Sequence, residues 1–534
     1  MTKQYIASVD VGTTSVRCFI TNSEGQTVSS ACAKVNLLYP QPGYVEINPD
    51  ELWNNVCSVI NSAVADAKIS FSQISLGIST QRATFTTWRK DNGRPFHNFI
   101  TWKDLRSDAL VKQWNRSFTI KTFRIGCYAL YLLTRNKRFL AASSFKFANT
   151  QTTMRLVWAL KYNSDLKQGI QHNNVMFGTI DTWLMYKFSG GKMHIIDVTN
   201  ASATGLYDPF VLNWAIWSKS ILNIPSFILP EVVDNDYNFG FTNKSIFGCA
   251  VPIRCMVSDQ SASMYGSCCF DHGDIKVTLG TGTFLDVNTK QKPHGSAAGL
   301  YPLVGWILNN EINYFIEGAC NDTGSIIQWA LSAGIIEDIQ ESSDLASSVE
   351  NTDGVYFIPA FSGLGPPIMD DNAASGFIGL KATSRKQHLI RAILESIVYR
   401  FTLLYNLLQK ETDLKIKGIS IDGGVANNDF VCQLLANILG IEVYRPTTTE
   451  VTILGVTFMT GLKAGMFYYV TIALQRDGLT VAGVWKTKND LQNMRTLSST
   501  FKPSSDIKIY ENCMNEFTMW LKAVDRFRLW YNLK

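Results

Sequence analysis

The stretch that most constrains the fold is residues 6–20, with the sequence IASVDVGTTSVRCFI. A run of small and β-branched residues ends at Asp10, a short turn follows at 12–15, and a second run of the same kind covers 16–20. Two such runs on either side of a short turn predict an antiparallel hairpin. Gly12 has no Cβ atom, so backbone N–H groups in this turn can approach an anion closely.

The side chains of this hairpin suit a phosphate group. Thr13, Thr14 and Ser15 place three hydroxyl donors at the turn. Asp10 lies at the end of the first strand, where its carboxylate could hold Mg²⁺ beside the phosphates. Arg17 adds a fixed positive charge nearby. On these residues alone, an ordinary hairpin with small turn residues remains an equal alternative.

Residues 275–287 repeat this pattern, with a strand, a small-residue turn that contains Thr281, and a returning strand. Two such hairpins in a chain of 534 residues predict duplicated α/β domains that close on one nucleotide. We expect the boundary near Gly266, with one domain at 1–265 and the other at 266–534. The sequence has neither a Walker P-loop nor a G-x-G-x-x-G motif, which disfavours the P-loop and Rossmann classes.

Polar residues follow two other expected strands. Asp259 follows a strand at 251–257 and opens a helix of small residues; a helix start keeps a carboxylate ionised, so this position suits a general base or a plain N-cap. Arg82 follows a strand at 74–79, at the end where open α/β sheets bind ligands, and could clamp a substrate or lie on the surface. Trp102 offers a flat apolar wall for a carbon backbone, or a core residue.

Composition excludes several other classes. The chain has 49 basic and 44 acidic residues, and the resulting net charge of +5 is too mild to imply nucleic acid by itself. Its 11 cysteines include no C-x-x-C pair, and Cys268, Cys269 and His272 lack the rest of a zinc site. The first strand begins within five residues, without a signal-peptide pattern, and the apolar runs are too short to span a bilayer. We therefore expect a cytoplasmic protein.

Two segments fall outside this pattern. Residues 109–164 contain ten basic and no acidic residues around an apolar run at 125–133. This segment could contact an anionic membrane or an acidic partner, or could simply be a solvated basic face. Further on, GLKAGMF at 461–467 is echoed by GLTVAGVW at 478–485, so residues 464–478 are interpreted as an insertion of no assigned function.

Several blocks of the sequence together resemble the FGGY carbohydrate kinases, and within them the glycerol kinases. The blocks are SVDVGTTSVR at 8–17, YPQPGYVEINPDELW at 39–53, GISTQRATF at 77–85, FGTIDTWL at 177–184, SDQSASMYG at 258–266, LGTGTFLDVNT at 279–289, GVYFIPAFSGLGPP at 354–367 and DGGVANN at 422–428. They occur in the family's order over nearly the whole chain. The STQRATF block and the divergent stretch after residue 109 are most similar to the glycerol kinase 5 branch.

The resemblance implies an actin-like, ribonuclease-H-like fold of two α/β domains that face a central cleft. It implies ATP and Mg²⁺ as cofactors, Asp10 as the residue that serves Mg²⁺, and Asp259 as the base that takes a proton from the substrate hydroxyl. The residues implied for substrate binding are Arg82, Trp102, Asp259, Gln260 and Phe284. The residues implied for ATP binding are Thr13, Thr14, Ser15, Arg17, Thr281, Gly324, Gln328, Gly424 and Asn428.

Two positions depart from the glycerol kinase pattern. Ala83 stands where the family carries a glutamate after the arginine, and Thr150 stands where it carries a tyrosine that contacts the substrate. Three hypotheses stay open: a glycerol kinase, a kinase of the same fold for another polyol or sugar, and a weakly catalytic ATP-binding scaffold that acts through partners or lipid surfaces. A homo-oligomer is compatible with each of them.

Overall fold

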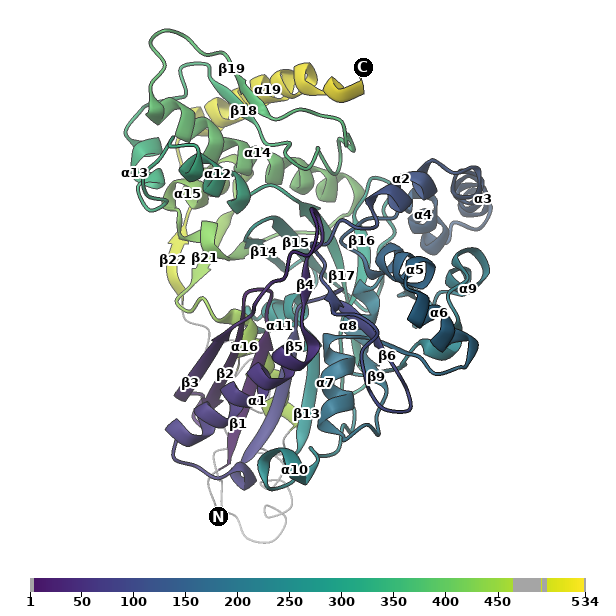
Figure 1. Ribbon diagram of the computed structural model, residues 1–534. Helices are drawn as coiled ribbons and strands as arrows, with labels where there is room; N and C mark the ends of the chain where they lie inside the picture. The colour runs from purple at the N-terminus through teal and green to yellow at the C-terminus, as the bar shows by residue number, and fades with distance from the viewer. Residues whose placement is uncertain (1–3, 464–490, 492–496, 533–534) are drawn as a thin grey trace.

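In a computed structural model, which describes residues 4–463, 491 and 497–532, the chain forms two α/β lobes (Figure 1). The interpretation of 464–478 as an insertion falls outside the described residues. The first strand, β1 (Tyr5–Val11), lies in the first lobe, and the last long helix, α19 (Ile507–Phe527), lies at the opposite end of the molecule.

A five-stranded sheet in the order β13-β5-β1-β2-β3 forms the centre of the first lobe. Its strands are β1 (Tyr5–Val11), β2 (Ser15–Thr21), β3 (Thr27–Lys34), β5 (Ile74–Thr80) and β13 (Ile253–Ser258). β1 pairs antiparallel with β2 and parallel with β5, which confirms the expected opening hairpin. Every residue of β5 is buried, so its apolar run lies inside the lobe.

Smaller sheets and helices complete the first lobe. A four-stranded sheet has the order β4 (Glu46–Ile47), β7 (Phe99–Ile100), β6 (Phe85–Trp88) and β8 (Met176–Thr179), and two pairs join β12 (Glu231–Val233) to β9 (Ile195–Asp197) and β10 (Tyr207–Asp208) to β11 (Asn213–Trp214). The helices are α1 (Pro49–Asp66), α2 (Asp108–Arg116), α3 (Phe118–Thr134), α4 (Lys137–Ser144), α5 (Thr152–Tyr162), α6 (Ser164–Gln171), α7 (Ile180–Phe188), α8 (Val198–Ala203), α9 (Ile216–Leu222), α10 (Lys244–Phe247) and α11 (Asp259–Gly266).

A seven-stranded sheet in the order β16-β17-β15-β14-β20-β21-β22 forms the second lobe. Its strands are β14 (Ile275–Leu279), β15 (Thr283–Lys290), β16 (Tyr301–Leu308), β17 (Glu311–Cys320), β20 (Gly418–Asp422), β21 (Glu442–Pro446) and β22 (Leu497–Phe501); β18 (Tyr356–Ile358) pairs with β19 (Gly376–Ile378). The helices are α12 (Gly324–Ser332), α13 (Ser342–Ser347), α14 (Lys386–Glu411), α15 (Asp429–Leu439), α16 (Val451–Lys463) and α19 (Ile507–Phe527).

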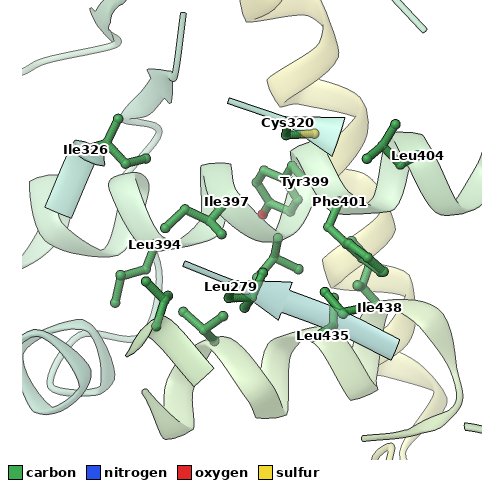
Figure 2. Close-up of a cluster of buried hydrophobic side chains, with 14 of the residues drawn as sticks. Leu279, Cys320, Ile326, Leu394, Ile397, Tyr399, Phe401, Leu404, Leu435 and Ile438 are labelled. Atoms are coloured by element: carbon green, nitrogen blue, oxygen red, sulfur yellow. The ribbon is translucent and has the colours of Figure 1, made fainter. Parts of the chain in front are cut away.

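The core of the second lobe lies between this sheet and its helices. Figure 2 shows Leu279 of β14 among apolar side chains of α14 and α15, including Ile397 and Leu435. The Trp520 indole of α19 is fully buried and donates a hydrogen bond to the Phe357 carbonyl at 2.8 Å. Burial of this much apolar surface makes the sheet a rigid support for the loops at its strand ends.

Helices α11 and α16 lie between the two sheets (Figure 1). A Cβ atom on Gly455 would fall 1.8 Å from the Ala262 carbonyl oxygen, and one on Gly266 would fall 2.1 Å from that of Val451, so the two backbones touch. The Ser8 and Thr457 hydroxyls are 2.7 Å apart, which places α16 against β1 of the first lobe. A helix that lies in sequence between β21 and β22 of the second sheet therefore packs on the first sheet.

Candidate active site

The turn of the first hairpin is bonded to two neighbouring elements. The Gly12 N–H donates to the Ser15 carbonyl at 3.0 Å, and the Gln81 side chain donates to the Gly12 carbonyl at 2.9 Å. The Thr13 hydroxyl accepts a hydrogen bond from the Trp102 indole at 3.0 Å. The structure therefore brings together the predicted phosphate turn, the end of β5 and the predicted apolar wall.

Asp10 lies at the end of β1 with almost no exposure. Its Oδ2 atom is 3.0 Å from Arg17 Nη2, while its Oδ1 atom has no hydrogen-bond partner among the described residues. Burial raises the pKa of Asp10 to about 6; Arg17 lowers it and the nearby Asp259 carboxylate raises it. A buried carboxylate oxygen without a partner, close to a second carboxylate, fits a divalent cation with oxygen ligands.

Arg17 is held by two acidic residues. Besides its contact with Asp10, its Nη1 atom donates to Glu450 Oε1 at 2.7 Å. Glu450 directly precedes α16, so this ion pair joins the first hairpin to that helix. Glu450 could not be predicted from the sequence, because it lies more than 400 positions from Arg17 along the chain.

Asp259 is the first residue of α11, and Ser258 is the N-cap. The Ser258 hydroxyl accepts no capping bond from the helix backbone and instead donates to the Ser261 hydroxyl at 3.0 Å, while Asp259 Oδ1 accepts a bond from the Gln260 N–H at 2.8 Å. Burial raises the pKa of Asp259, while Arg82 and Lys276 lower it. The carboxylate is thus not used as an N-cap and faces the first lobe's Arg82.

Arg82 connects the two lobes. Its Nε atom is 3.6 Å from Asp259 Oδ1, and its Nη1 atom is 2.6 Å from Glu317 Oε2 on β17. The guanidinium lies 5.9 Å from the centre of the Phe284 ring on β15. The structure therefore brings three of the predicted substrate residues together and adds Glu317.

Gln260 bonds α11 to the second sheet. Its Oε1 atom accepts hydrogen bonds from Lys276 Nζ and the Thr278 hydroxyl, each at 3.2 Å. Lys276 Nζ is also 3.1 Å from Asp422 Oδ2, which accepts a further bond from Ser263 at 2.8 Å. These contacts hold the start of α11 against β14 and β20.

Three loops of the second lobe converge at the predicted nucleotide turn. The Gly324 N–H donates to the Gly280 carbonyl at 2.9 Å, which joins the start of α12 to the turn that exposes Thr281. Gly423 has a φ of +93°, and a Cβ atom there would fall 2.5 Å from the Leu279 carbonyl oxygen. A Cβ on Gly424 would meet open space. Only glycine at 423 permits this approach without strain.

Gln328 and Asn428, the two other residues predicted to bind the nucleotide, lie in different surroundings. Gln328 is exposed on α12. The Asn428 side chain is buried; it accepts a bond from the Val431 N–H and donates one to the Ser342 hydroxyl, both at 3.0 Å. Its amide thus caps α15 and ties α13 to it. Roles for both residues in nucleotide binding stay predictions.

The backbones of Ala83 and Thr150, the two positions that depart from the glycerol kinase pattern, are both bonded to the buried Arg155 side chain. Ala83 has a φ of +61°, and its carbonyl accepts bonds from Thr152 at 3.0 Å and Arg155 at 2.9 Å. Arg155 also donates to the carbonyl of Thr150, whose side chain is exposed. Because residue 83 is alanine, this position offers no carboxylate to Arg82.

Comparison with known proteins identifies the family of this chain. Residues 5–266 match the N-terminal domain of the FGGY family of carbohydrate kinases, and residues 275–464 match its C-terminal domain. The chain is 44% identical to glycerol kinase 5 of Danio rerio, over 99% of this chain and 97% of that protein. The chain belongs to the FGGY family of carbohydrate kinases.

The similarity to other FGGY proteins also extends over nearly the whole chain. Glycerol kinase 5 of Homo sapiens is 41% identical over 99% of this chain and 96% of that protein. The crystal structure of Plasmodium falciparum glycerol kinase with ADP superposes with a TM-score of 0.84 at 27% identity, over 98% of each chain. The two-domain actin-like fold is thus confirmed. As an FGGY kinase the chain is an ATP-utilising phosphotransferase with an alcohol group as acceptor.

Proposed function

We propose that this chain is an ATP-dependent glycerol kinase that forms sn-glycerol 3-phosphate in glycerol degradation and glycerolipid metabolism. One observation carries the proposal most directly: Asp259 lies 3.6 Å from Arg82 and close enough to Asp10 to raise its pKa. A candidate base, a candidate acceptor contact and a candidate cation ligand therefore share one site. The names of the relatives support glycerol as the acceptor.

The acceptor side of the site supplies a base and binding groups. Asp259 takes the proton of the acceptor hydroxyl as the oxygen attacks the γ-phosphorus. Arg82 and Gln260 bind the other hydroxyl groups, and the faces of Trp102 and Phe284 contact the carbon chain. Because Arg82 contacts Phe284 and Glu317 across the lobes, closure orders these groups and excludes water.

The donor side surrounds the triphosphate with groups of both lobes. The hydroxyls of Thr13, Thr14 and Ser15 and the Thr281 turn donate to phosphate oxygens, with Arg17 nearby. Gly324, Gln328, Gly424 and Asn428 line the nucleoside. Asp10 would hold Mg²⁺, whose charge would offset that of the phosphates. The buried Asp10 Oδ1 atom, which lacks a partner among the described residues, supports this assignment.

An ADP-release assay on purified protein, with a panel of polyols and sugars, tests the proposal. Glycerol-dependent turnover that is lost in Asp259→Asn supports a glycerol kinase. If turnover occurs with another alcohol and not with glycerol, that alcohol is the substrate and the assignment of glycerol is wrong. ATP binding without turnover across the panel would contradict a kinase role and favour a scaffold.

Another polyol or sugar is a second candidate acceptor, and Ala83 and Thr150 favour it. A hydrogen bond from a hydroxyl to a carboxylate contributes about 1.5–3 kcal/mol, so loss of the family glutamate at position 83 lowers the affinity for glycerol. The same ADP-release panel separates the two acceptors by their kcat/KM values.

A contact between α3 and an anionic membrane is a separate proposal, supported by exposure. The Phe118, Ile125 and Leu133 side chains are 83%, 71% and 81% exposed. The cations of Lys121 and Arg135 are exposed near the two ends of the helix. Figure 1 shows α2, α3 and α4 at the outer edge of the molecule. Apolar side chains between cations fit a surface of anionic lipid better than an acidic protein.

Co-sedimentation with phosphatidylserine-containing vesicles tests this contact. We expect salt-sensitive binding that Ile125→Ser and Leu133→Ser each weaken, whereas Ile507→Ser on α19, where the side chain is 65% exposed, leaves it unchanged. Equal binding of all variants, or none by the unmodified protein, would contradict it. In the described part of the chain no helix has the length and apolar character of a membrane span.

Three further assignments complete the proposal. We place the domain boundary at Gly266, the last residue of α11, so that residues 1–265 bind acceptor and phosphates and residues 266–534 bind the nucleotide. A cytoplasmic location and a homo-oligomer stay predictions from the sequence. Subcellular fractionation and light scattering test them.

A further inference from the structure

A row of polar side chains crosses the sheet of the second lobe beside Arg82. In the strand register Lys276 of β14 lies opposite Asp286 of β15, Asp286 opposite Glu317 of β17, and Glu317 opposite Tyr301 of β16. Side chains that pair across strands share one face of a sheet. Because Glu317 contacts Arg82, this face is turned toward the acceptor site.

Three members of the row have defined partners. Lys276 is paired with Asp422 at 3.1 Å. Glu317 uses both of its oxygens: Oε2 is 2.6 Å from Arg82 Nη1, and Oε1 accepts the hydroxyl proton of Tyr301. The Glu317 carboxylate therefore stands between a cation of the first lobe and a phenol of the second.

Asp286 differs from the others. It is fully buried, and neither of its oxygens accepts a hydrogen bond from a donor in the described part of the chain. An ionised carboxylate in that state would be strongly destabilising, whereas a protonated one is a donor. Burial and the Glu317 carboxylate raise the pKa of Asp286 well above its ordinary value, while Arg82 and Lys276 lower it.

We propose that Asp286 is a positioning residue for acceptor binding: its carboxyl group donates a hydrogen bond to Glu317, and Glu317 in turn fixes the Arg82 guanidinium beside Asp259. The inference rests on the proposed function for the contact between Arg82 and the acceptor. The second lobe thus supplies carboxyl groups next to Arg82 in addition to Asp259 of the first lobe, whereas Ala83 supplies none.

Substitutions that keep or remove the donor separate this role from simple packing. Asp286→Asn retains an N–H donor of nearly the same shape, so we expect an acceptor KM within about threefold of the unmodified value. Asp286→Leu fills the space without a donor, and we expect an acceptor KM about tenfold higher with the KM for ATP unchanged. Equal acceptor KM values for both variants, or a parallel rise in the KM for ATP, would overturn the proposal.

The pH dependence of thermal stability gives a readout that does not need turnover. Folded Asp286 keeps its proton above the ordinary value of 3.8, at which the unfolded chain releases it, so the folded state binds more protons and loses stability as pH rises. Asparagine has no proton to release. We therefore expect the Tm of Asp286→Asn, relative to the unmodified protein, to rise by about 2 °C or more between pH 5 and pH 9.

Glu317→Gln serves as the reciprocal variant, because it removes the carboxylate that raises the pKa of Asp286. We therefore expect its Tm, relative to that of the unmodified protein, also to rise with pH. A Tm difference that is constant with pH in both variants would overturn the carboxyl pair. If the Tm difference rises with pH but the protein turns over no acceptor, the hydrogen bond between Asp286 and Glu317 is supported. That result would contradict only the proposed function.

Discussion

At the scale of single residues, the candidate site consists of groups that were predictable and groups that were not. Asp10 lies at the end of a strand, and Arg82 and Asp259 follow strand ends, which is a local signal; the structure brings the three together. Glu317 and Glu450 were missed because each contacts its partner across the fold. An acidic residue within a buried strand was the available signal for Glu317.

The protonation of Asp259 predicts an acid limit on activity. A general base must be ionised, and burial raises the pKa of Asp259 above the ordinary value of 3.8. We expect kcat/KM to fall tenfold per pH unit below that raised pKa, so that the decline begins at a higher pH than an ordinary aspartate would cause. A pH–rate profile that stays flat down to pH 4 in a stable enzyme would exclude Asp259 as the base.

At the scale of elements, hairpins and helices were predictable because their signals are local, whereas their packing was not. The expected helix that opens at Asp259 is observed as α11 (Asp259–Gly266). The position of α16 against the first sheet could not be inferred, because this helix lies in sequence between two strands of the second sheet, β21 and β22. The buried Arg155 of α5 was likewise unexpected, since arginine is rarely buried without an acidic partner.

Arg155 is predicted to hold the loops beside the acceptor site. Its guanidinium donates to the carbonyls of Ile100, Thr101, Ala83 and Thr150, from two neighbouring segments and its own. Arg155→Met leaves these buried acceptors without a donor, and we expect a loss of about 3–5 kcal/mol of unfolding free energy. Lys161→Met, at an exposed position of the same helix, is the control and should change it by less than about 0.5 kcal/mol in a urea titration.

At the scale of the whole molecule, the lobes are joined by α11 and α16 and by contacts across the acceptor site. Gly455 and Gly266 allow the two helices to touch, and Arg82 reaches Glu317 and Phe284 of the second lobe. The sequence predicted two lobes around one nucleotide from the repeated hairpins. It could not predict the helix contact, because that contact depends on packing between distant segments.

The close contact between α11 and α16 at Gly455 predicts that one added methyl group lowers stability and activity. A Cβ on Gly455 would lie 1.8 Å from the Ala262 carbonyl oxygen, so Gly455→Ala must separate α11 from α16. We expect it to cost about 1–3 kcal/mol of stability and to lower kcat by displacing Asp259. Gly126→Ala is the matched control, because a Cβ there has no neighbour within 4 Å; it should be neutral or stabilising by up to about 1 kcal/mol.

The most direct test of the account compares turnover and ATP affinity in the unmodified protein and Asp259→Asn. Removal of the base should lower kcat by about 10²–10⁴-fold with the preferred alcohol, while the Kd for ATP measured by calorimetry stays within about threefold. Retention of kcat within about tenfold by Asp259→Asn would contradict the assignment of Asp259 as the group that deprotonates the acceptor.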